Sequence, residues 1–484
     1  MFFNSLDFAF FLPLVFLFYW FVCNKNLRFQ NIFLVFVSYI FYGWWDWRFL
    51  SLIIFSSLLD FILGKKIANT VDKNKSKFFL YTSVIVNLGF LGFFKYYNFF
   101  VQSFANSFNF LGLNFNVSTL NIILPVGISF YTFQTLSYSI DVYRGKIKEA
   151  TDPISFFAFV SFFPQLVAGP IERATNLLPQ FYNKRVFNYD KAVSGARLIL
   201  WGFFQKIVIA DGCALYVNDI FENYLLYSSP TLIFGAVLFA FQIYGDFAGY
   251  SNIAIGVSRL FGFDLMRNFN YPYFSRDIGE FWRRWHISLS TWFRDYLYIP
   301  LGGSKGSKWN KVRNVFIIFI ISGFWHGANW TFIVWGGLNA LFFLPLLINN
   351  KNRKYLNDIS PNHFLPSVKT FFQICFTFTL TSFTWIFFRS KSVLDAIQYV
   401  KRIFINSDYL TLSSDRTMNV SIKPLLLALI LFVLFEWYNR NRESIVGGDI
   451  FKFSYMRYGL YFVTIIMIIL NISNEANGFI YFQF

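Results

Sequence analysis

Long runs of apolar residues dominate the chain, and short polar stretches separate them. These runs follow neither the alternation of a half-buried strand nor the 3.6-residue period of a surface helix. A helix needs about 20 mostly apolar residues to cross a hydrocarbon core about 30 Å thick. The pattern therefore predicts an all-α, polytopic membrane protein with roughly 10 to 13 transmembrane or re-entrant helices. The predicted blocks are Phe8–Cys23, Asn31–Trp45, Phe49–Leu63, Phe78–Phe94, Ile122–Ile140, Ile154–Val167, Ala196–Ala210, Leu232–Tyr244, Val315–Leu347, Phe371–Phe388, Leu425–Phe435 and Tyr461–Leu470.

Basic residues alternate between the two predicted sides of the membrane. Lys25 and Arg28 follow the first apolar block, whereas the loop after the second block offers only Arg48, next to Asp46. The loop after the third block carries five lysines: Lys65, Lys66, Lys73, Lys75 and Lys77. Because cytoplasmic loops retain Lys and Arg, this alternation places the N-terminus outside. The first block has no preceding Lys or Arg and no clear cleavage site, so we expect an uncleaved span.

Composition supports the bilayer as the solvent of this chain. Of the 484 residues, 56% are hydrophobic and 14% are charged, against about 25% charged in soluble domains. The net charge of +17 comes from Lys and Arg in short loops, which indicates membrane topology and no nucleic-acid partner. Cys23, Cys213 and Cys375 lie far apart and suit neither a disulfide framework nor a zinc site. We predict no metal, no cofactor, and a single membrane domain over residues 1–484.

The longest uncharged run contains one of the three histidines. From Val315 to Asn350 no residue carries a fixed charge, which is more than one span requires. His326 lies at membrane depth in this run, where ionisable groups are costly and indicate function. Desolvation favours the neutral imidazole, which can take a proton from a hydroxyl as a general base. The alternative is a histidine that only bridges carbonyl groups of a broken helix. Four glycines predict that break: Gly323, Gly327, Gly336 and Gly337.

His286 lies forty residues earlier. Asp277 and Glu280 predict a capping box at the start of its segment. A helix continuing from there would place His286 on an aromatic face, opposite a basic face, as in an interfacial or re-entrant helix. Taken alone, a buried core histidine is the plainer interpretation. The aromatic face comprises Trp282, Trp285, Leu289, Trp292 and Phe293.

Two features of the surroundings complete this picture. Seven of the 14 tryptophans lie between Trp282 and Trp335, around both histidines. They could form an interfacial belt or the wall of an acyl pocket. The third histidine, His363, lies in a polar, proline-flanked loop, and we expect it to be a bystander.

Five segments, in this order along the chain, resemble segments of the membrane-bound O-acyltransferase family. The likeness is clearest from about residue 124 to residue 341. It is closest to the bacterial branch that acetylates alginate, other exopolysaccharides or peptidoglycan, with teichoic-acid D-alanyl transferases as relatives. Each motif alone is modest, but five in order within a polytopic chain are specific. They are Phe163-Pro-Gln-Leu-Val-Ala-Gly-Pro-Ile-Glu-Arg173, Tyr244-Gly-Asp-Phe-Ala-Gly-Tyr-Ser251, Arg284-Trp-His-Ile-Ser-Leu-Ser290, Asp295-Tyr-Leu-Tyr-Ile-Pro-Leu-Gly-Gly303 and Phe324-Trp-His-Gly-Ala-Asn-Trp330.

The resemblance implies a helical fold around a central tunnel, with His326 as the catalytic histidine and His286 as a second catalytic-site position. It implies that an acyl group, acetyl in this branch, leaves a cytoplasmic donor such as acetyl-CoA. The group would reach an extracytoplasmic polymer directly or through a periplasmic or extracellular acetyltransferase partner. The implied location is the bacterial inner (cytoplasmic) membrane. Asn329 would orient His326 or donate to a developing oxyanion. Asp246 is the only acid in its segment, because Asn252 stands where the family often has an acid.

Two weaker signals concern the donor and the acyl group. The loop after Gly302 misses the Gly-x-x-x-x-Gly-Lys-Ser/Thr spacing and is expected to be a flexible basic loop. In the sharper interpretation, Lys305, Lys308 and Arg313 attract the phosphates of coenzyme A. Tyr481 lies in the aromatic run at the C-terminus. It is either an interfacial anchor or a hydroxyl that transiently carries the acyl group.

Two other functions remain open at this point. A transporter or flippase with a midplane site would also use broken helices, although inverted repeats are lacking and intramembrane acid–base pairs are scarce. D-alanyl transfer to teichoic acid would use the same site with another acyl group. Hydrolysis of acetyl-CoA by the purified protein would separate an enzyme from a transporter.

Overall fold

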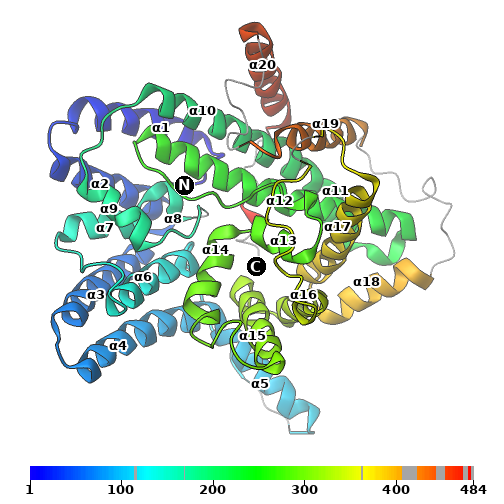
Figure 1. The fold of residues 1–484 in the computed structure, drawn as a ribbon, viewed down its shortest axis with the longest axis horizontal. Helices are drawn as coiled ribbons and strands as arrows, with labels where there is room; N and C mark the ends of the chain where they lie inside the picture. Colours follow the sequence, from blue (N-terminus) through cyan, green and yellow to red (C-terminus); the bar gives the residue numbers. More distant parts are fainter. Residues whose placement is uncertain are drawn as a thin grey trace. The chain divides into compact units, whose positions relative to one another are not determined.

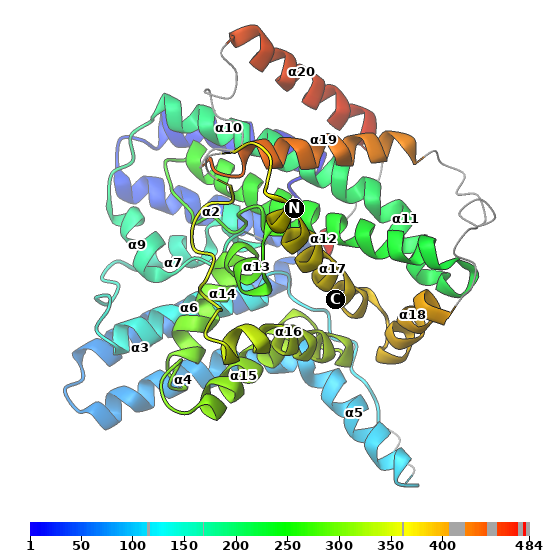
Figure 2. The same cartoon turned by 45° about the vertical axis from the view of Figure 1, so that its right-hand side comes forward.

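The computed structural model describes residues 1–113, 117–167, 169–360, 363–405, 422–442, 453–472 and 478–480. Within these ranges the regular secondary structure is entirely helical (Figures 1 and 2), which confirms the all-α prediction. The chain divides into two compact units, Met1–Ala196 with Ala254–Met266, and Arg197–Ile253 with Arg267–Phe484. The single domain over residues 1–484 stays a prediction.

Seven helical stretches in the described ranges are long and apolar enough to cross a membrane. Two shorter apolar helices, Leu6–Val22 and Pro153–Leu166, accompany them. A segment of this length and composition satisfies its backbone hydrogen bonds internally, which a hydrocarbon environment requires. The chain is therefore a multi-pass membrane protein. The seven stretches are Leu27–Asn69, Lys73–Phe110, Tyr189–Glu222, Ser229–Leu260, Trp330–Ile348, Val368–Arg389 and Ser454–Asn471.

The first unit consists of the N-terminal helices. Two π-helical segments, η1 and η3, and one 3₁₀ turn, η2, extend its longer helices. Helix α10 runs from this unit into the second one. The elements are α1 (Leu6–Leu17), η1 (Phe18–Val22), α2 (Leu27–Asp46), η2 (Trp47–Phe49), α3 (Leu50–Asn69), α4 (Lys73–Leu91), η3 (Gly92–Tyr96), α5 (Tyr97–Phe110), α6 (Ile128–Tyr143), α7 (Pro153–Ser161), α8 (Phe163–Leu166), α9 (Ala174–Tyr182) and α10 (Tyr189–Phe203).

A buried polar cluster joins α3, α4 and α6, which lie side by side in Figures 1 and 2. Asp60 is fully buried and accepts hydrogen bonds from Ser83, Asn87 and Ser139. Such a group is tolerated inside a membrane bundle only when partners satisfy it. The predicted block Ile122–Ile140 is wrong at its start, because helix α6 begins only after Gly127, whose φ is 75°.

The second unit contains the candidate site. Helix α12 begins in it and ends in the first unit. The elements are η4 (Phe204–Ala210), α11 (Asp211–Glu222), η5 (Tyr224–Leu226), α12 (Ser229–Leu260), η6 (Pro272–Phe274), α13 (Ile278–Arg284), α14 (Ile287–Phe293), η7 (Arg294–Tyr298), α15 (Lys308–His326), α16 (Trp330–Ile348), α17 (Val368–Arg389), α18 (Val393–Ile405), α19 (Lys423–Asn439) and α20 (Ser454–Asn471).

Helices α15 and α16 form a tight hairpin, visible in both ribbon views. A Cβ on Gly323 would lie 2.2 Å from the carbonyl oxygen of Phe332, and one on Gly336 would lie 2.3 Å from that of Phe319. Small residues let helix backbones approach this closely in a membrane. The predicted break in the long apolar run is present, but it lies at Gly327, whereas Gly323 and Gly336 lie inside the helices.

Candidate active site

His326 is the last residue of α15, directly before the break in the hairpin. It is 2% exposed. Gly327 follows in an extended conformation, and a Cβ there would lie 2.1 Å from the ring of Phe332. The absence of a side chain at this position therefore permits the close contact with Phe332. The position agrees with the prediction of a histidine beside a helix break.

Aromatic rings surround the His326 imidazole. Its centroid lies 5.0 Å from Trp325, 5.2 Å from Trp335 and 5.5 Å from Phe388. Trp335 also stacks on Trp385 at 5.5 Å. Packing on several sides fixes the orientation of the imidazole and keeps its environment apolar. Trp325 and Trp335 therefore pack against the imidazole, whereas Trp309 and Trp330 are exposed.

His286 lies at a second break in the chain. Its φ of 43° and ψ of 55° are left-handed, and it separates the short helices α13 and α14. The prediction of one continuous helix through this segment is therefore wrong. A non-glycine residue in this region of φ and ψ is uncommon, and such strain concentrates at functional sites. The helix start was predicted correctly, because the Asp277 carboxylate accepts from the Glu280 N–H at 2.7 Å.

Asn268 positions the His286 ring. Its Oδ1 lies 3.1 Å from Nδ1 of His286 and accepts a hydrogen bond from the Ser288 hydroxyl at 2.9 Å. Its Nδ2 donates to the Ser251 hydroxyl at 3.0 Å. Since a carbonyl oxygen accepts, His286 carries its proton on Nδ1 and presents a lone pair on Nε2. That Nε2 has no hydrogen-bond partner among the described residues.

The two histidines face the same cavity. Their ring centroids are 6.3 Å apart, and both line a cavity of about 190 Å³. His286 is 1% exposed, and burial lowers the pKa of its imidazole to about 3. It is therefore neutral at pH 7, as a proton acceptor must be. The structure thus brings together the two histidines that the sequence singled out from 40 residues apart.

Asn329 lies three residues after His326, at the start of α16. It is the N-cap residue of α16, and its Oδ1 accepts from the Thr331 N–H at 3.0 Å. Its Nδ2 donates to the carbonyl oxygen of Lys391, also at 3.0 Å. Both ends of the amide contact the backbone, so the side chain starts α16 and holds the segment after α17. A role in orienting His326 or binding an oxyanion stays a prediction.

Asp246 holds the C-terminal segment, Gly478–Ile480. Its carboxylate forms an ion pair with Lys206 at 2.7 Å and accepts from the Ile480 N–H at 2.6 Å. Phe479 is fully buried, with its ring 4.7 Å from Tyr250. Lys206 also donates to the Asp211 carboxylate at 2.9 Å, so opposite charges compensate one another at this depth.

The C-terminal segment thereby reaches the wall of the site. The Phe479 ring lies 5.5 Å from Phe247, and Phe247 lies 4.5 Å from His286. Tyr481, the next candidate along the chain, lies outside the described residues. Asn252, in the same helix as Asp246, donates to the Gln205 side chain at 2.7 Å.

The three predicted donor-binding residues do not line the histidine cavity. Lys305 lies in the loop before α15, and Lys308 is the first residue of that helix. Arg313 lines a separate apolar groove with Trp309 on α15. Their role stays a prediction. His363 lies in an exposed loop, where its carbonyl oxygen accepts from Arg440 at 2.7 Å.

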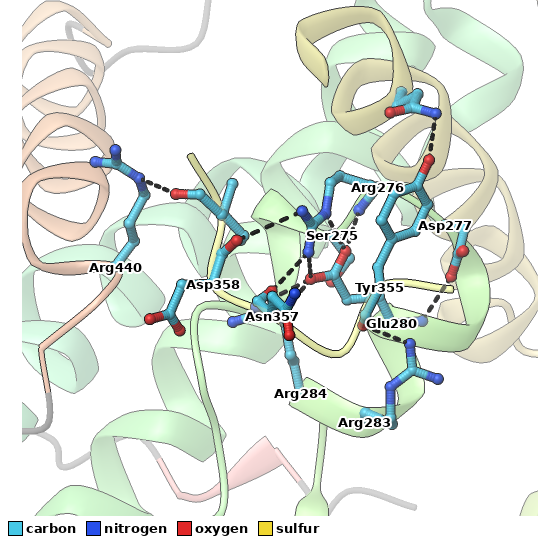
Figure 3. Close-up of polar contacts among 12 residues, drawn as sticks. Ser275, Arg276, Asp277, Glu280, Arg283, Arg284, Tyr355, Asn357, Asp358 and Arg440 are labelled. Carbon is cyan, nitrogen blue, oxygen red and sulfur yellow. Dashed lines mark hydrogen bonds and ion pairs between the residues drawn. The ribbon is translucent and has the colours of Figure 1, made fainter. Parts of the chain in front are cut away.

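A charged network fixes α13 beside the cavity (Figure 3). The buried Glu280 carboxylate binds Arg276 at 2.8 Å and Arg284 at 2.9 Å. Arg276 also donates to the carbonyl oxygen of Asn357 at 2.8 Å, and Arg283 donates to that of Tyr355 at 2.9 Å. These bonds tie the loop after α16 to the helix that precedes His286.

Sequence reasoning missed several residues that the structure places at the site. Asn268 carries no spacing signal, because it lies 18 residues before its histidine in an irregular segment. Phe388 was assigned only to an apolar block. Arg294 and Arg353 line the histidine cavity, yet in the sequence they are merely two basic residues among 42.

A protein-family model matches the part of the chain that contains this site. The family model described as MBOAT, the membrane-bound O-acyltransferase family, matches residues 146–388. These limits enclose both histidines, Asn268 and every residue that lines their cavity.

Individual relatives resemble most of the chain. A probable alginate O-acetylase of Pseudomonas putida is 36% identical over 94% of this chain and 95% of its own length. A peptidoglycan O-acetyltransferase of Helicobacter pylori is 35% identical over 82% of this chain and 79% of its own. A teichoic acid D-alanyltransferase of Bacillus subtilis is 32% identical over 54% of this chain and 69% of its own.

Proposed function

Because the chain belongs to the membrane-bound O-acyltransferase family, we propose that it moves an acetyl group across the membrane to a cell-surface polymer. The acyl donor is a cytoplasmic thioester, acetyl-CoA, and the acceptor is a hydroxyl of an extracytoplasmic polysaccharide or of peptidoglycan. The observation that carries this proposal is the pair of buried histidines facing one cavity, 6.3 Å apart. Two relatives that match more than four fifths of the chain are named as O-acetylating enzymes.

His326 acts as the general base. As the acceptor oxygen attacks the thioester carbonyl, the imidazole takes the hydroxyl proton, which typically contributes about 10²–10⁴-fold to the rate. A C–O bond forms, the C–S bond breaks, and the proton passes to the departing thiolate. The aromatic wall of Trp325, Trp335 and Phe388 excludes water, which would otherwise compete as the nucleophile.

His286 binds the reacting hydroxyl. With its proton held on Nδ1 by Asn268, its Nε2 lone pair can accept a hydrogen bond from that hydroxyl and orient the oxygen. Its lowered pKa keeps this lone pair available at neutral and mildly acidic pH. The two imidazoles therefore have separate roles, one orienting and one removing a proton.

The membrane topology supports a direction for the acetyl group. Lys305 lies in the loop before α15 and Lys308 begins that helix, and this stretch carries no acidic residue, which supports a cytoplasmic location for this end of α15 in a bacterial inner membrane. The acetyl group enters there and leaves on the opposite face, to the polymer or to a periplasmic acetyltransferase partner. Acetyl transfer is favoured over D-alanyl transfer because the D-alanyltransferase likeness covers a smaller share of the chain.

Tyr481 is proposed as a transient carrier of the acetyl group on its phenolic oxygen. The Gly478–Ile480 segment just before it is held by Asp246, and Phe479 packs near the site. Tyr481→Phe removes only the hydroxyl, so it is expected to abolish polymer acetylation without loss of protein. Full activity of this variant would refute the carrier role and leave interfacial anchoring.

Mass analysis of cell-surface polymers tests the proposed function. A deletion strain is expected to lose O-acetyl esters from one polymer, and the intact gene restores them whereas His326→Ala does not. Immunoblots of membranes must show equal amounts of both proteins. Loss of D-alanyl esters with unchanged O-acetylation would replace acetyl by D-alanyl transfer. Unchanged esters of both kinds would contradict acyl transfer altogether.

A further inference from the structure

A polar cavity lies in the first unit, where helix α2 begins. It measures about 380 Å³ and is lined by residues from the start of α2, the turn that starts α7 and the end of α9. Helix α7 packs against both α2 and α9, as Figures 1 and 2 show. Every lining residue belongs to the first unit, whereas both histidines belong to the second. This cavity is therefore a different site from the histidine cavity.

Buried polar groups form a fixed floor in this cavity. The Asn31 amide donates to the Ser155 hydroxyl at 3.2 Å and to the Phe181 carbonyl oxygen at 2.9 Å. Its Oδ1 accepts from the Arg185 guanidinium at 2.7 Å. These bonds join α2, α7 and the end of α9 around the cavity, so its polar wall is built from three elements.

Two opposite charges line the cavity, and the protein leaves part of each unused. Arg28 contributes its backbone N–H to the Asn26 side chain at 2.8 Å, but its guanidinium has no hydrogen bond or ion pair within the described part of the chain. Asp152 accepts from the N–H and the hydroxyl of Ser155 through Oδ2 alone, at 2.8 and 2.6 Å. The cavity therefore offers a ligand one cation and one carboxylate oxygen.

An exposed apolar ridge leads from the cavity along α2. Arg28 is the second residue of the stretch Leu27–Asn69, which is long and apolar enough to cross the membrane. Every fourth residue after Arg28 is exposed and apolar: Ile32 at 43%, Phe36 at 61% and Ile40 at 38%. Residues four apart are neighbours on a helix, so this ridge is about 18 Å long. Half of a hydrocarbon core is about 15 Å thick, so the ridge matches an acyl chain within one leaflet.

These features match the headgroup of one class of phospholipid. A guanidinium binds a phosphate through two parallel hydrogen bonds, and a carboxylate oxygen accepts from a primary ammonium. Phosphoethanolamine carries both groups, separated by two carbon atoms. An anionic headgroup without the ammonium would leave the charge of Asp152 uncompensated, and the trimethylated ammonium of choline has no N–H to donate.

We propose that this cavity binds the headgroup of a membrane phosphatidylethanolamine, with the phosphate on Arg28, the ammonium on Asp152 and an acyl chain along α2. The bound lipid joins the start of α2 to the start of α7 and so stabilises the first unit. The pattern of basic loops predicts that this end of α2 faces the cytoplasm, so the lipid belongs to the inner leaflet. Soluble glycerophosphoethanolamine carries the same headgroup but lacks the chains that the ridge contacts. The inference does not depend on the acyl-transfer reaction.

Lipid titrations of the thermal unfolding of the full, delipidated chain in detergent test this directly. Phosphatidylethanolamine is expected to raise the unfolding temperature more than phosphatidylcholine or phosphatidylglycerol with the same acyl chains. Arg28→Gln should weaken the binding of phosphatidylethanolamine at least about tenfold. Asp152→Asn keeps an N-cap acceptor for Ser155, but phosphatidylethanolamine should then bind no better than phosphatidylglycerol. Lys25→Gln is the matched control, because it removes a neighbouring exposed charge that does not line the cavity, and it should bind lipid normally.

Equal stabilisation by the three lipids, or an unchanged affinity for phosphatidylethanolamine in either cavity variant, would refute the headgroup site. If a substitution lowers stability by itself, native mass spectrometry of the folded proteins decides, because the wild type should retain a phosphatidylethanolamine molecule that the variant loses. Glycerophosphoethanolamine should bind the wild type at least about tenfold more weakly than the lipid, since it buries no acyl chain. Equal affinity for the two would overturn a membrane lipid as the source of the headgroup.

Discussion

Replacement of Asn268 by alanine should slow the enzyme by releasing the ring of His286. The substitution removes the acceptor of the His286 Nδ1 proton and of the Ser288 hydroxyl, at 3.1 and 2.9 Å, and the donor to Ser251. A buried polar group left without its partner costs about 1–3 kcal/mol. If the reacting hydroxyl depends on the orientation of His286, that cost corresponds to a fall of roughly 5- to 150-fold in kcat.

The assay is thioester turnover by protein in detergent, with thermal unfolding measured on the same samples. Asn270→Ala is the matched control, because Asn270 contributes its backbone N–H and carbonyl oxygen to Arg284, which the substitution leaves in place. It should retain wild-type kcat. Asn268→Ala with wild-type kcat would refute the positioning role.

Asn268→Asp distinguishes loss of the His286 hydrogen bond from general loss of folding. The carboxylate keeps the acceptor for the Nδ1 proton, so part of the activity should return. Its negative charge favours the imidazolium and so raises the pKa of His286 above its native value of about 3. Activity should then fall as the pH drops through this raised pKa, within a range where the wild type shows no loss from this group. An unchanged pH profile with full activity would contradict the argument.

Two further predictions concern the helices that hold the site. Gly323→Ala should destabilise the protein by about 1–3 kcal/mol, because its Cβ would lie 2.2 Å from the Phe332 carbonyl oxygen. Gly337→Ala is the control and should not lower the unfolding temperature, because its Cβ meets nothing within 4 Å; equal effects of the two substitutions would refute the close packing. Asp246→Ala leaves Lys206 with only one carboxylate partner and should lower the free energy of unfolding by roughly 3 kcal/mol. The C-terminal segment should then become accessible to carboxypeptidase, and unchanged resistance to digestion would show that Asp246 does not anchor it.

The sequence predicted those features that depend on local pattern. Apolar length predicted the membrane helices, and the glycines in the uncharged run predicted the break beside His326. A local sequence pattern cannot predict contacts between residues that are far apart in the sequence. Asn268 reaches His286 only because an irregular segment returns to it, and Arg353 reaches the cavity only because Arg283 ties its loop to α13. The left-handed backbone of His286 also overrides a helical periodicity that continues on both sides of it.

The central claim is that His326 removes a proton during acyl transfer. The most direct measurement is the initial rate of acetyl thioester turnover by purified wild-type and His326→Ala proteins, both shown to be folded by thermal unfolding. The account predicts that the rate falls by about 10²–10⁴-fold while coenzyme A binding is retained. A His326→Ala protein that turns over the thioester within about twofold of the wild-type rate, well short of the loss expected for a general base, would contradict it.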